Sequence, residues 1–182
     1  PPLVEGHCHL DKTFLGAPWQ SYRGPPGVPN RIATEKEVRL RLDVPAAVRA
    51  AALLEREIAF GTGYLRTHVD VSPEWGLDNL EAVLGIREAF AGRIAIEIVA
   101  FPQSGIAAAP GTADLLDAAL GAGADLVGGL DPWAIDGARN DHLDVVFALA
   151  EKHGKGVDIH LHEGGAEGLT SITAIAERTA QA

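Results

Sequence analysis

The fold is indicated by residues 64–71, YLRTHVDV, an apolar and β-branched run with the length and composition of a buried strand. Comparable runs occupy residues 94–101, 125–130 and 157–161, and an earlier run, residues 3–9, opens the chain. The runs that begin at 64, 94, 125 and 157 start 30, 31 and 32 residues apart, close to the length of one strand plus one helix. The sequence therefore predicts five βα units in succession.

Stretches with the spacing of amphipathic helices separate the predicted strands. They are residues 34–60, 77–90, 113–120, 142–153 and 171–181. Thr34 and Glu37 have the spacing of a capping box, so we expect the first helix to begin at Thr34 and to be long. Residues 16–33 hold four prolines and three glycines, which predict an extended loop before this helix.

Strands that are buried on both faces and alternate with helices form a parallel sheet of the α/β class. A doubly wound sheet would normally carry a glycine-rich phosphate turn after its first strand, and residues 6–11, GHCHLD, stand there instead. We therefore predict a (β/α)8 TIM barrel. A complete barrel takes about 250 residues. Residues 1–182 are accordingly expected to be a single domain, the N-terminal part of a partial barrel with strands 1–5 and without strands 6–8.

The composition excludes several classes of partner. Lys and Arg total 15 against 25 for Asp and Glu, and the net charge of −10 repels phosphate backbones and anionic lipids. Cys8 is the single cysteine, so no disulfide forms within the chain, and no apolar run approaches the roughly 20 residues of a membrane helix. We expect a cytoplasmic protein that binds neither nucleic acid nor membranes, and homo-oligomerisation stays open.

Two pairs of histidines stand at the ends of predicted strands. Side chains alternate along a strand, so His7 and His9 share one face while Cys8 packs on the other. His160 and His162 share a face on the fifth strand. Strands one and five lie opposite each other in an eight-stranded barrel, so imidazoles from both can meet near its axis. These pairs predict a metal site, and hydrogen-bonded core histidines are the alternative.

Three further residues are candidates for chemistry beside such a metal. Glu163 follows the fifth strand and suits a general acid/base acting on a metal-activated water. Gln103, after the third strand, offers an acceptor and donors to a substrate ring, with capping of a loop as the alternative. Trp133 follows the fourth strand and either walls the pocket or packs structurally.

Other polar residues are expected in structural roles. Asp70 and Asp131 end strands two and four, and capping of the helices that follow is favoured for both. His68 is expected to be an interior histidine with its hydrogen bonds satisfied. His142 and His153, which flank the fourth of the predicted βα helices, are expected to face solvent.

Four strings occur in order along nearly the whole chain: GHCHLDKT (6–13), RTHVDV (66–71), VAFPQ (99–103) and DIHLHE (158–163). Together they resemble the cytosine deaminase branch of the amidohydrolase superfamily. The resemblance implies a barrel with one metal site that hydrolyses a C–N bond on a nitrogen heterocycle. The implied substrate is a cytosine-like pyrimidine or an aminotriazine, and the implied product is ammonia or an amine.

The resemblance also implies the roles of individual residues. It matches His7, His9 and His160 to the metal ligands, Glu163 to the proton-shuttling acid/base and Gln103 to the glutamine that hydrogen-bonds the ring, and His162 and Trp133 are added as substrate-binding candidates. Binuclear members carry a bridging lysine on the fourth strand, and residues 125–132 contain none. One divalent metal ion, zinc or iron, is therefore expected.

Relatives of this kind also use a histidine from the sixth strand, an aspartate from the eighth and a flanking β-sandwich, which we do not find in this sequence. The alternative to an enzyme is therefore a non-catalytic barrel fragment, or a degenerate relative that binds metal or ligand without turnover. An unrelated parallel α/β binding protein, which would hold no stoichiometric metal, is a third interpretation.

Overall fold

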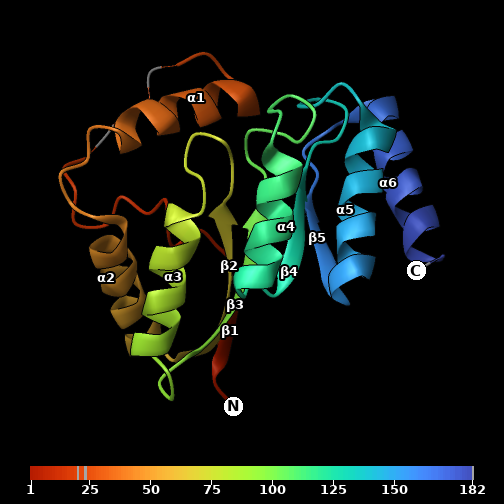
Figure 1. Cartoon of the computed structure of the whole chain (residues 1–182). Coiled ribbons are helices and arrows are strands. Elements are labelled where there is room, and N and C mark those ends of the chain that lie inside the picture. Colours follow the sequence, from red (N-terminus) through yellow and green to blue (C-terminus); the bar gives the residue numbers. More distant parts are fainter. Residues whose placement is uncertain (20, 23, 182) are drawn as a thin grey trace.

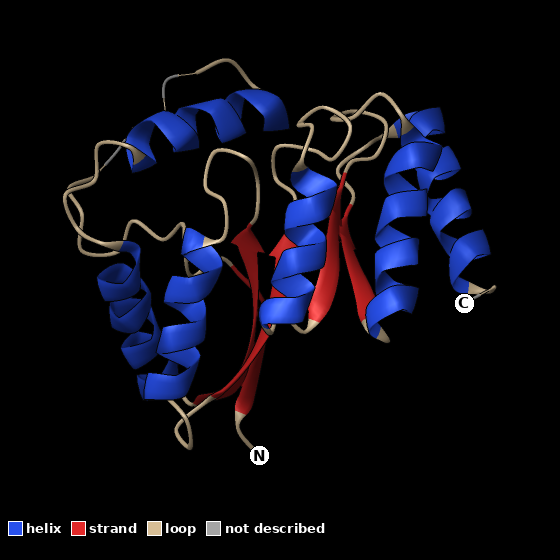
Figure 2. Cartoon of the chain, viewed as in Figure 1, coloured by secondary structure: helices blue, strands red, loops and turns tan. Residues whose placement is uncertain are grey.

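The computed structural model describes residues 1–19, 21–22 and 24–181. Its five strands are β1 (Leu3–Cys8), β2 (Thr62–Asp70), β3 (Ala95–Phe101), β4 (Leu126–Leu130) and β5 (Gly156–His160). They pair in parallel in the order β1-β2-β3-β4-β5, and the sheet curls into half of a barrel (Figures 1 and 2). The predicted partial (β/α)8 barrel of five parallel βα units is confirmed.

Six helices accompany the strands in the described ranges. They are α1 (Val28–Arg39), α2 (Ala46–Ala59), α3 (Asp78–Ala89), α4 (Thr112–Ala122), α5 (Arg139–His153) and α6 (Gly165–Thr179). Figure 1 shows α2 to α6 standing beside the strands, while α1 lies across the end of the sheet toward which the strands run. Among these described helices none is long and apolar enough to span a membrane. The cytoplasmic location stays a prediction.

The apolar core lies between the sheet and its helices. Alternate residues of the strands point into it and are almost completely buried, as are apolar residues from the facing helices; they include Leu65, Val69, Ile98, Leu54, Leu80 and Leu116. Cys8 is half-buried against this core, which confirms the predicted packing of its side chain. The intervening residues of the same strands therefore face the concave side of the sheet, where polar side chains gather.

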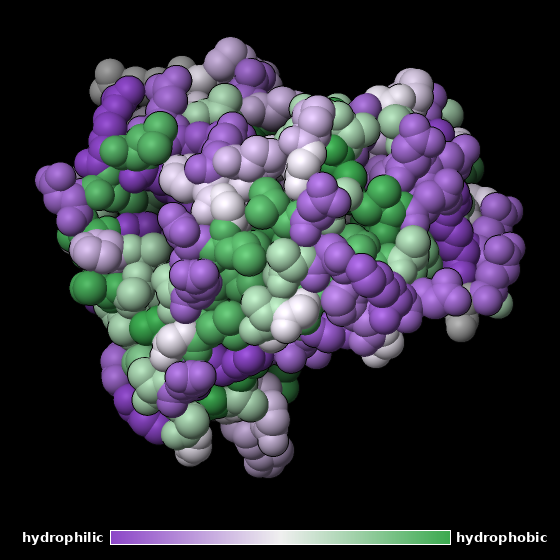
Figure 3. Space-filling model, viewed as in Figure 1, coloured by the Kyte–Doolittle hydropathy of each residue, from purple (hydrophilic) through white to green (hydrophobic). Residues whose placement is uncertain are grey.

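The helix-covered face is a solvated outer layer. Figure 3 shows hydrophilic residues over α6 at its right-hand edge and apolar residues among polar ones at its centre, around α3 and α4. Oppositely charged residues pair on this surface, as Lys152 with Asp117 and Arg178 with Asp144, each at 2.7 Å. The predicted site residues come instead from the sheet and the segments that follow its strands.

The predicted long helix over residues 34–60 is wrong, because the chain forms two helices there. Pro45 occupies the N-cap position of α2, and proline has no N–H with which to continue a preceding helix. Thr34 lies inside α1, where its hydroxyl donates to the carbonyl of Asn30 at 2.9 Å, so it caps nothing. The predicted loop over residues 16–33 is too long, since α1 already begins at Val28 with a proline in its first turn.

A buried ion network holds α1 against the ends of β1 and β2. The Arg39 guanidinium lies 2.6 Å from Asp70 Oδ2 and 3.5 Å from Asp11 Oδ2, and it stacks 4.5 Å from the centre of the Trp75 ring. Lys12 Nζ lies 2.7 Å from Asp70 Oδ1. Burial, followed by the neighbouring Asp70 charge, raises the pKa of Asp11. Asp70 therefore belongs to this network, and the predicted capping role is wrong because Leu77 is the N-cap of α3.

Replacement of Arg39 tests this network. Arg39→Met keeps most of the side-chain volume but leaves the buried Asp11 and Asp70 carboxylates short of a cation, and we expect it to lower the free energy of unfolding by about 3–5 kcal/mol. Arg41→Met is the matched control, since Arg41 pairs with Glu37 on the exposed surface and should cost less than about 0.5 kcal/mol. Urea unfolding of both variants checks the difference, and equal costs would contradict the role of the network.

Candidate metal centre

Three imidazoles from opposite edges of the sheet converge at the ends of β1 and β5. His7 Nε2 lies 3.2 Å from His9 Nε2 and 2.9 Å from His160 Nε2. His68 of β2 joins them, and one nitrogen from each of the four rings lies within 4.8 Å of the others. The structure thus places the three residues predicted as ligands around one point, together with a fourth histidine.

The donor set suits a divalent cation. Ligands bound to zinc through imidazole nitrogen lie 2.0–2.1 Å from the metal, which puts neighbouring ligand atoms about 3 Å apart, as observed between these Nε2 atoms. His68 adds a buried Nδ1 that has no hydrogen-bond partner among the described residues. Nitrogen donors favour zinc, iron and similar metals over magnesium or calcium. The residues therefore fit a metal ion.

Electrostatics keep these rings in the form that binds metal. Burial, with the nearby Lys12 charge, lowers the pKa of His9 to about 2. Burial, with the neighbouring His68, lowers the pKa of His160 to about 3 and also moves the pKa of His7 downward. Neutral imidazole is the ligand form, because protonation occupies the lone pair. His7, His9 and His160 are therefore uncharged and able to accept a cation at neutral pH.

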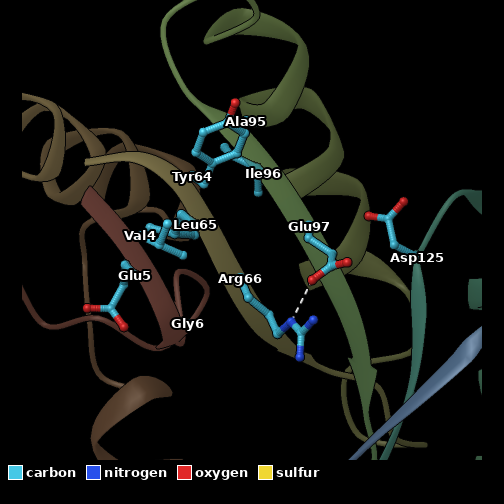
Figure 4. Close-up of a pocket in the computed structure, with 10 residues that line it drawn as sticks. All are labelled: Val4, Glu5, Gly6, Tyr64, Leu65, Arg66, Ala95, Ile96, Glu97 and Asp125. Atoms are coloured by element: carbon cyan, nitrogen blue, oxygen red, sulfur yellow. Dashed lines mark hydrogen bonds and ion pairs between the residues drawn. The ribbon is translucent and has the colours of Figure 1, made fainter. Parts of the chain in front are cut away.

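Charged groups on the concave face hold one of these rings, that of His68. Asp158 of β5 lies 3.0 Å from His68 Nε2 and accepts a hydrogen bond from Arg66 Nη1 at 2.8 Å. Figure 4 shows Arg66 reaching in turn toward Glu97 of β3, whose carboxylate accepts its Nε–H at 2.5 Å. The hydrogen bond with His68 is the largest cause that lowers the pKa of Asp158 to about 2. An ionised Asp158 thus orients the imidazole of His68.

The predicted role of His68 needs correction. It is buried, as expected, but among the described residues only its Nε2 has a hydrogen-bond partner. Its hydrogen bonds are therefore not satisfied, and it takes part in the cluster. The sequence pattern that could have indicated this role is the spacing of His68 and Arg66, which are two residues apart in β2 and therefore share the concave face.

Two hollows follow the concave side of the sheet. One, of about 360 Å³, is lined by His7, His68, His160, His162 and Asp158, and so opens directly onto the cluster. The other, of about 470 Å³, lies over β1 to β3, where Tyr64, Arg66 and Glu97 face it (Figure 4). The first hollow is the one in which a ligand would meet the histidines.

Glu163 lies beside the segment that follows β4. Its Oε1 accepts the N–H groups of Trp133 at 2.7 Å and Ala134 at 2.9 Å, and its Oε2 accepts the hydroxyl of Ser171. Burial raises the pKa of Glu163, but these hydrogen bonds outweigh it and hold the pKa below its ordinary value. Glu163 is therefore a carboxylate held by Trp133, Ala134 and Ser171. It follows His160 by three residues in the sequence but is not part of the histidine cluster. The indole of Trp133 faces the Arg139 guanidinium at 5.3 Å and is 46% exposed.

Gln103 is connected to the histidine cluster through Lys12 and Phe101. The Phe101 ring packs 4.6 Å from the ring of His160, and Lys12 Nζ lies 5.0 Å from its centre. Lys12 donates to Gln103 Oε1, while Gln103 Nε2 donates to Glu35 Oε1 at 3.3 Å. Gln103 is buried, and no expectation was placed on Phe101 or Lys12, because their contacts depend on how β1, β3 and α1 meet.

Asp131 and His142 occupy places that the sequence did not predict. Asp131 binds the backbone and ring of His162, and Ala138 is the N-cap of α5, so the predicted capping role of Asp131 is wrong. His142 is completely buried, with its Nδ1 2.7 Å from Asp136 Oδ2, and the predicted solvent exposure is wrong. His153 is only partly exposed and pairs with Asp117 at 2.6 Å.

Fold and site together define a curled half-barrel with a candidate metal centre at the carboxyl ends of its strands. No protein-family model matches the chain. The chain is 40% identical over 97% of its length to the uncharacterized protein YahJ of Escherichia coli K12. It is 31% identical over 98% of its length to N-isopropylammelide isopropyl amidohydrolase of Pseudomonas sp. strain ADP. These matches span 39% and 45% of the two relatives, respectively, so the chain covers less than half of either.

Solved structures agree with these relatives. The chain superposes over its whole length on N-isopropylammelide isopropylaminohydrolase of Burkholderia multivorans, with a TM-score of 0.91 and 49% identity, and covers 45% of that chain. It superposes over 98% of its length on 5-methylcytosine deaminase of Klebsiella pneumoniae, with a TM-score of 0.76 and 30% identity, again covering 45% of that chain. The chain is thus a homologue of deaminases of the amidohydrolase superfamily, which confirms the resemblance carried by its four strings.

Metal binding by single-site variants tests the centre. We expect His160→Asn to weaken zinc binding at least about 100-fold, because it removes one of the three converging nitrogens. His68→Asn should weaken zinc binding about 10-fold, the loss expected when a residue that supports the ligands, here in contact with Asp158, is removed. His153→Asn, which changes a histidine paired with a surface aspartate, is the control. Zinc titration of the metal-free protein measures each affinity, and an unchanged zinc affinity in His160→Asn would contradict the assignment of the centre.

Proposed function

We propose that the protein is a metal-dependent hydrolase that cleaves a C–N bond on a nitrogen heterocycle and releases ammonia or an amine. The observation that carries this proposal is the convergence of the Nε2 atoms of His7, His9 and His160 from the two edges of the sheet. The relatives support the reaction class, since they include deaminases and an amidohydrolase that removes an alkylamine. Because the chain spans less than half of each, the activity of the whole protein belongs to the proposal.

One zinc or iron ion bound by these histidines would supply a Lewis acid that activates water for attack on the ring carbon. Glu163 is the candidate base. Two backbone N–H groups donate to its Oε1 and fix that oxygen. Its Oε2 accepts only the hydroxyl of Ser171, which can rotate away, so Oε2 is the oxygen proposed to receive a proton. The protonated carboxyl can then donate to the departing nitrogen.

Binding of the ring is assigned to Gln103, His162 and Trp133. Lys12 occupies the oxygen of the Gln103 amide, and one N–H of its NH2 group donates to Glu35, so the second N–H is the one proposed to donate to a substrate acceptor. His162 lines the hollow beside the cluster. Trp133 has an exposed indole, which is proposed to wall the pocket.

Aminotriazines are favoured over cytosine-like pyrimidines as the first substrates to test. The chain is 49% identical to the aminohydrolase that is named for an N-isopropyl triazine, against 30% for the 5-methylcytosine deaminase. The complete gene product, loaded with zinc or iron in turn, should release an amine or ammonia from a panel of N-alkylaminotriazines, cytosine and isocytosine. Absence of release from the whole panel would contradict the proposed function and favour a binding protein without turnover.

Glu163→Gln tests the assignment of the acid/base. The amide cannot accept the proton, so kcat should fall about 10²–10⁴-fold while the metal content stays unchanged. Glu177→Gln makes the same chemical change at an exposed position of α6 and should leave kcat unaltered. A Glu163→Gln variant with full activity would assign proton transfer to another group.

A further inference from the structure

Asp131 has an unusual backbone at the end of β4. Among the described residues other than glycine, it alone has a positive φ, of 36°, a conformation that side chains other than those of Asn and Asp rarely adopt. Its side chain is buried. Its Oδ1 accepts the backbone N–H groups of His162 at 2.5 Å and Glu163 at 3.2 Å. The conformation of Asp131 is thus fixed by the segment that follows the neighbouring strand.

The second oxygen of the same carboxylate determines the proton position on a ring. Asp131 Oδ2 lies 2.9 Å from His162 Nδ1. An ionised carboxylate only accepts hydrogen bonds, so the proton of this contact resides on Nδ1. In the neutral ring the lone pair then belongs to Nε2, which becomes a hydrogen-bond acceptor.

The ring of His162 is available to a ligand. Its side chain is 47% exposed, its centre lies 6.0 Å from that of His160, and it lines the hollow of about 360 Å³ that opens onto the histidine cluster. A ligand placed beside the candidate metal centre therefore meets the ring of His162 in an orientation that is fixed by the contact of its Nδ1 with Asp131.

We propose that Asp131 is a positioning residue that sets His162 to accept a hydrogen bond from an N–H of the substrate ring. This inference rests on the proposed function and narrows its substrate class. Rings that present a lactam or amino N–H at this position satisfy Nε2, whereas rings with a bare nitrogen there place two lone pairs against each other. The pair therefore selects the hydrogen-bonding pattern of the heterocycle and not only its size.

Asp131→Asn reverses the polarity of His162 while the histidine remains. The Asn oxygen is needed by the two backbone N–H groups, so its NH2 group faces His162 Nδ1 and donates to it. The ring proton then moves to Nε2. Asp136→Asn is the matched control, because Asp136 makes the same type of contact with Nδ1 of the buried His142, and His142 is not among the residues around the hollow.

The tautomers are measured by ¹⁵N NMR of the ring nitrogens in the zinc-loaded complete gene product. We expect His162 to carry its proton on Nδ1 in the parent protein and on Nε2 in Asp131→Asn, with no change in Asp136→Asn. A proton on Nε2 of neutral His162 in the parent protein would overturn the inference. This readout does not depend on turnover.

Substrate discrimination is measured on the heterocycle found in the screen above and on its N-methyl derivatives. Methylation of the N–H that faces His162 should lower kcat/KM at least 10-fold in the parent protein and less than about 3-fold in Asp131→Asn and His162→Ala. Asp136→Asn should keep the 10-fold discrimination even where it lowers stability. An equal loss on all substrates in Asp131→Asn would show a purely structural role and overturn the inference. If no heterocycle is turned over, the proposed function fails, and the NMR result alone decides whether Asp131 sets His162.

Discussion

The site depends on the 2.9 Å approach of His7 to His160, two residues on the outer strands of a five-stranded sheet. In a flat sheet the first and fifth strands would lie nearly 20 Å apart, since neighbours are about 4.8 Å from each other. Only the curl of the sheet, together with side chains that point to its concave side, closes this distance (Figure 2). The candidate metal centre is therefore a property of the barrel curvature, and no single segment of the chain contains it.

The parts of the fold and site that could be predicted follow from periodicity. Alternation along β1 and β5 gave His7, His9 and His160 a common face, and parallel strands brought their ends to one edge. The parts that were missed depend on contacts between distant segments. Arg39 pairs with Asp70, which is 31 residues further along the chain. His142 is buried because it lies on the side of α5 that contacts Asp136. Local patterns near Thr34 and Asp131 indicated caps. Thr34 instead lies inside α1 and donates to the carbonyl of Asn30 in the same helix, whereas Asp131 accepts tertiary hydrogen bonds from the segment that follows β5.

Polarity at the site is fixed by residues that do not themselves reach the hollow. Lys12 occupies the oxygen of Gln103, and Asp131 occupies Nδ1 of His162. Gln103 is thereby left with the N–H that does not reach Glu35, and His162 is left with its Nε2. Both supporting residues are buried, where rearrangement of hydrogen bonds is costly, so the pattern offered to a ligand is set before it binds.

The contact of Arg66 with Asp158 joins β2 to β5, two strands that are not neighbours in the sheet. This ion pair spans the concave side of the sheet, where an ordinary barrel is filled by layers of apolar side chains. The Asp158 carboxylate also lies 3.9 Å from His160 Nδ1, so it places negative charge behind one of the imidazoles that face the centre. One carboxylate thus links two strands that are not neighbours and also lies beside the candidate metal centre.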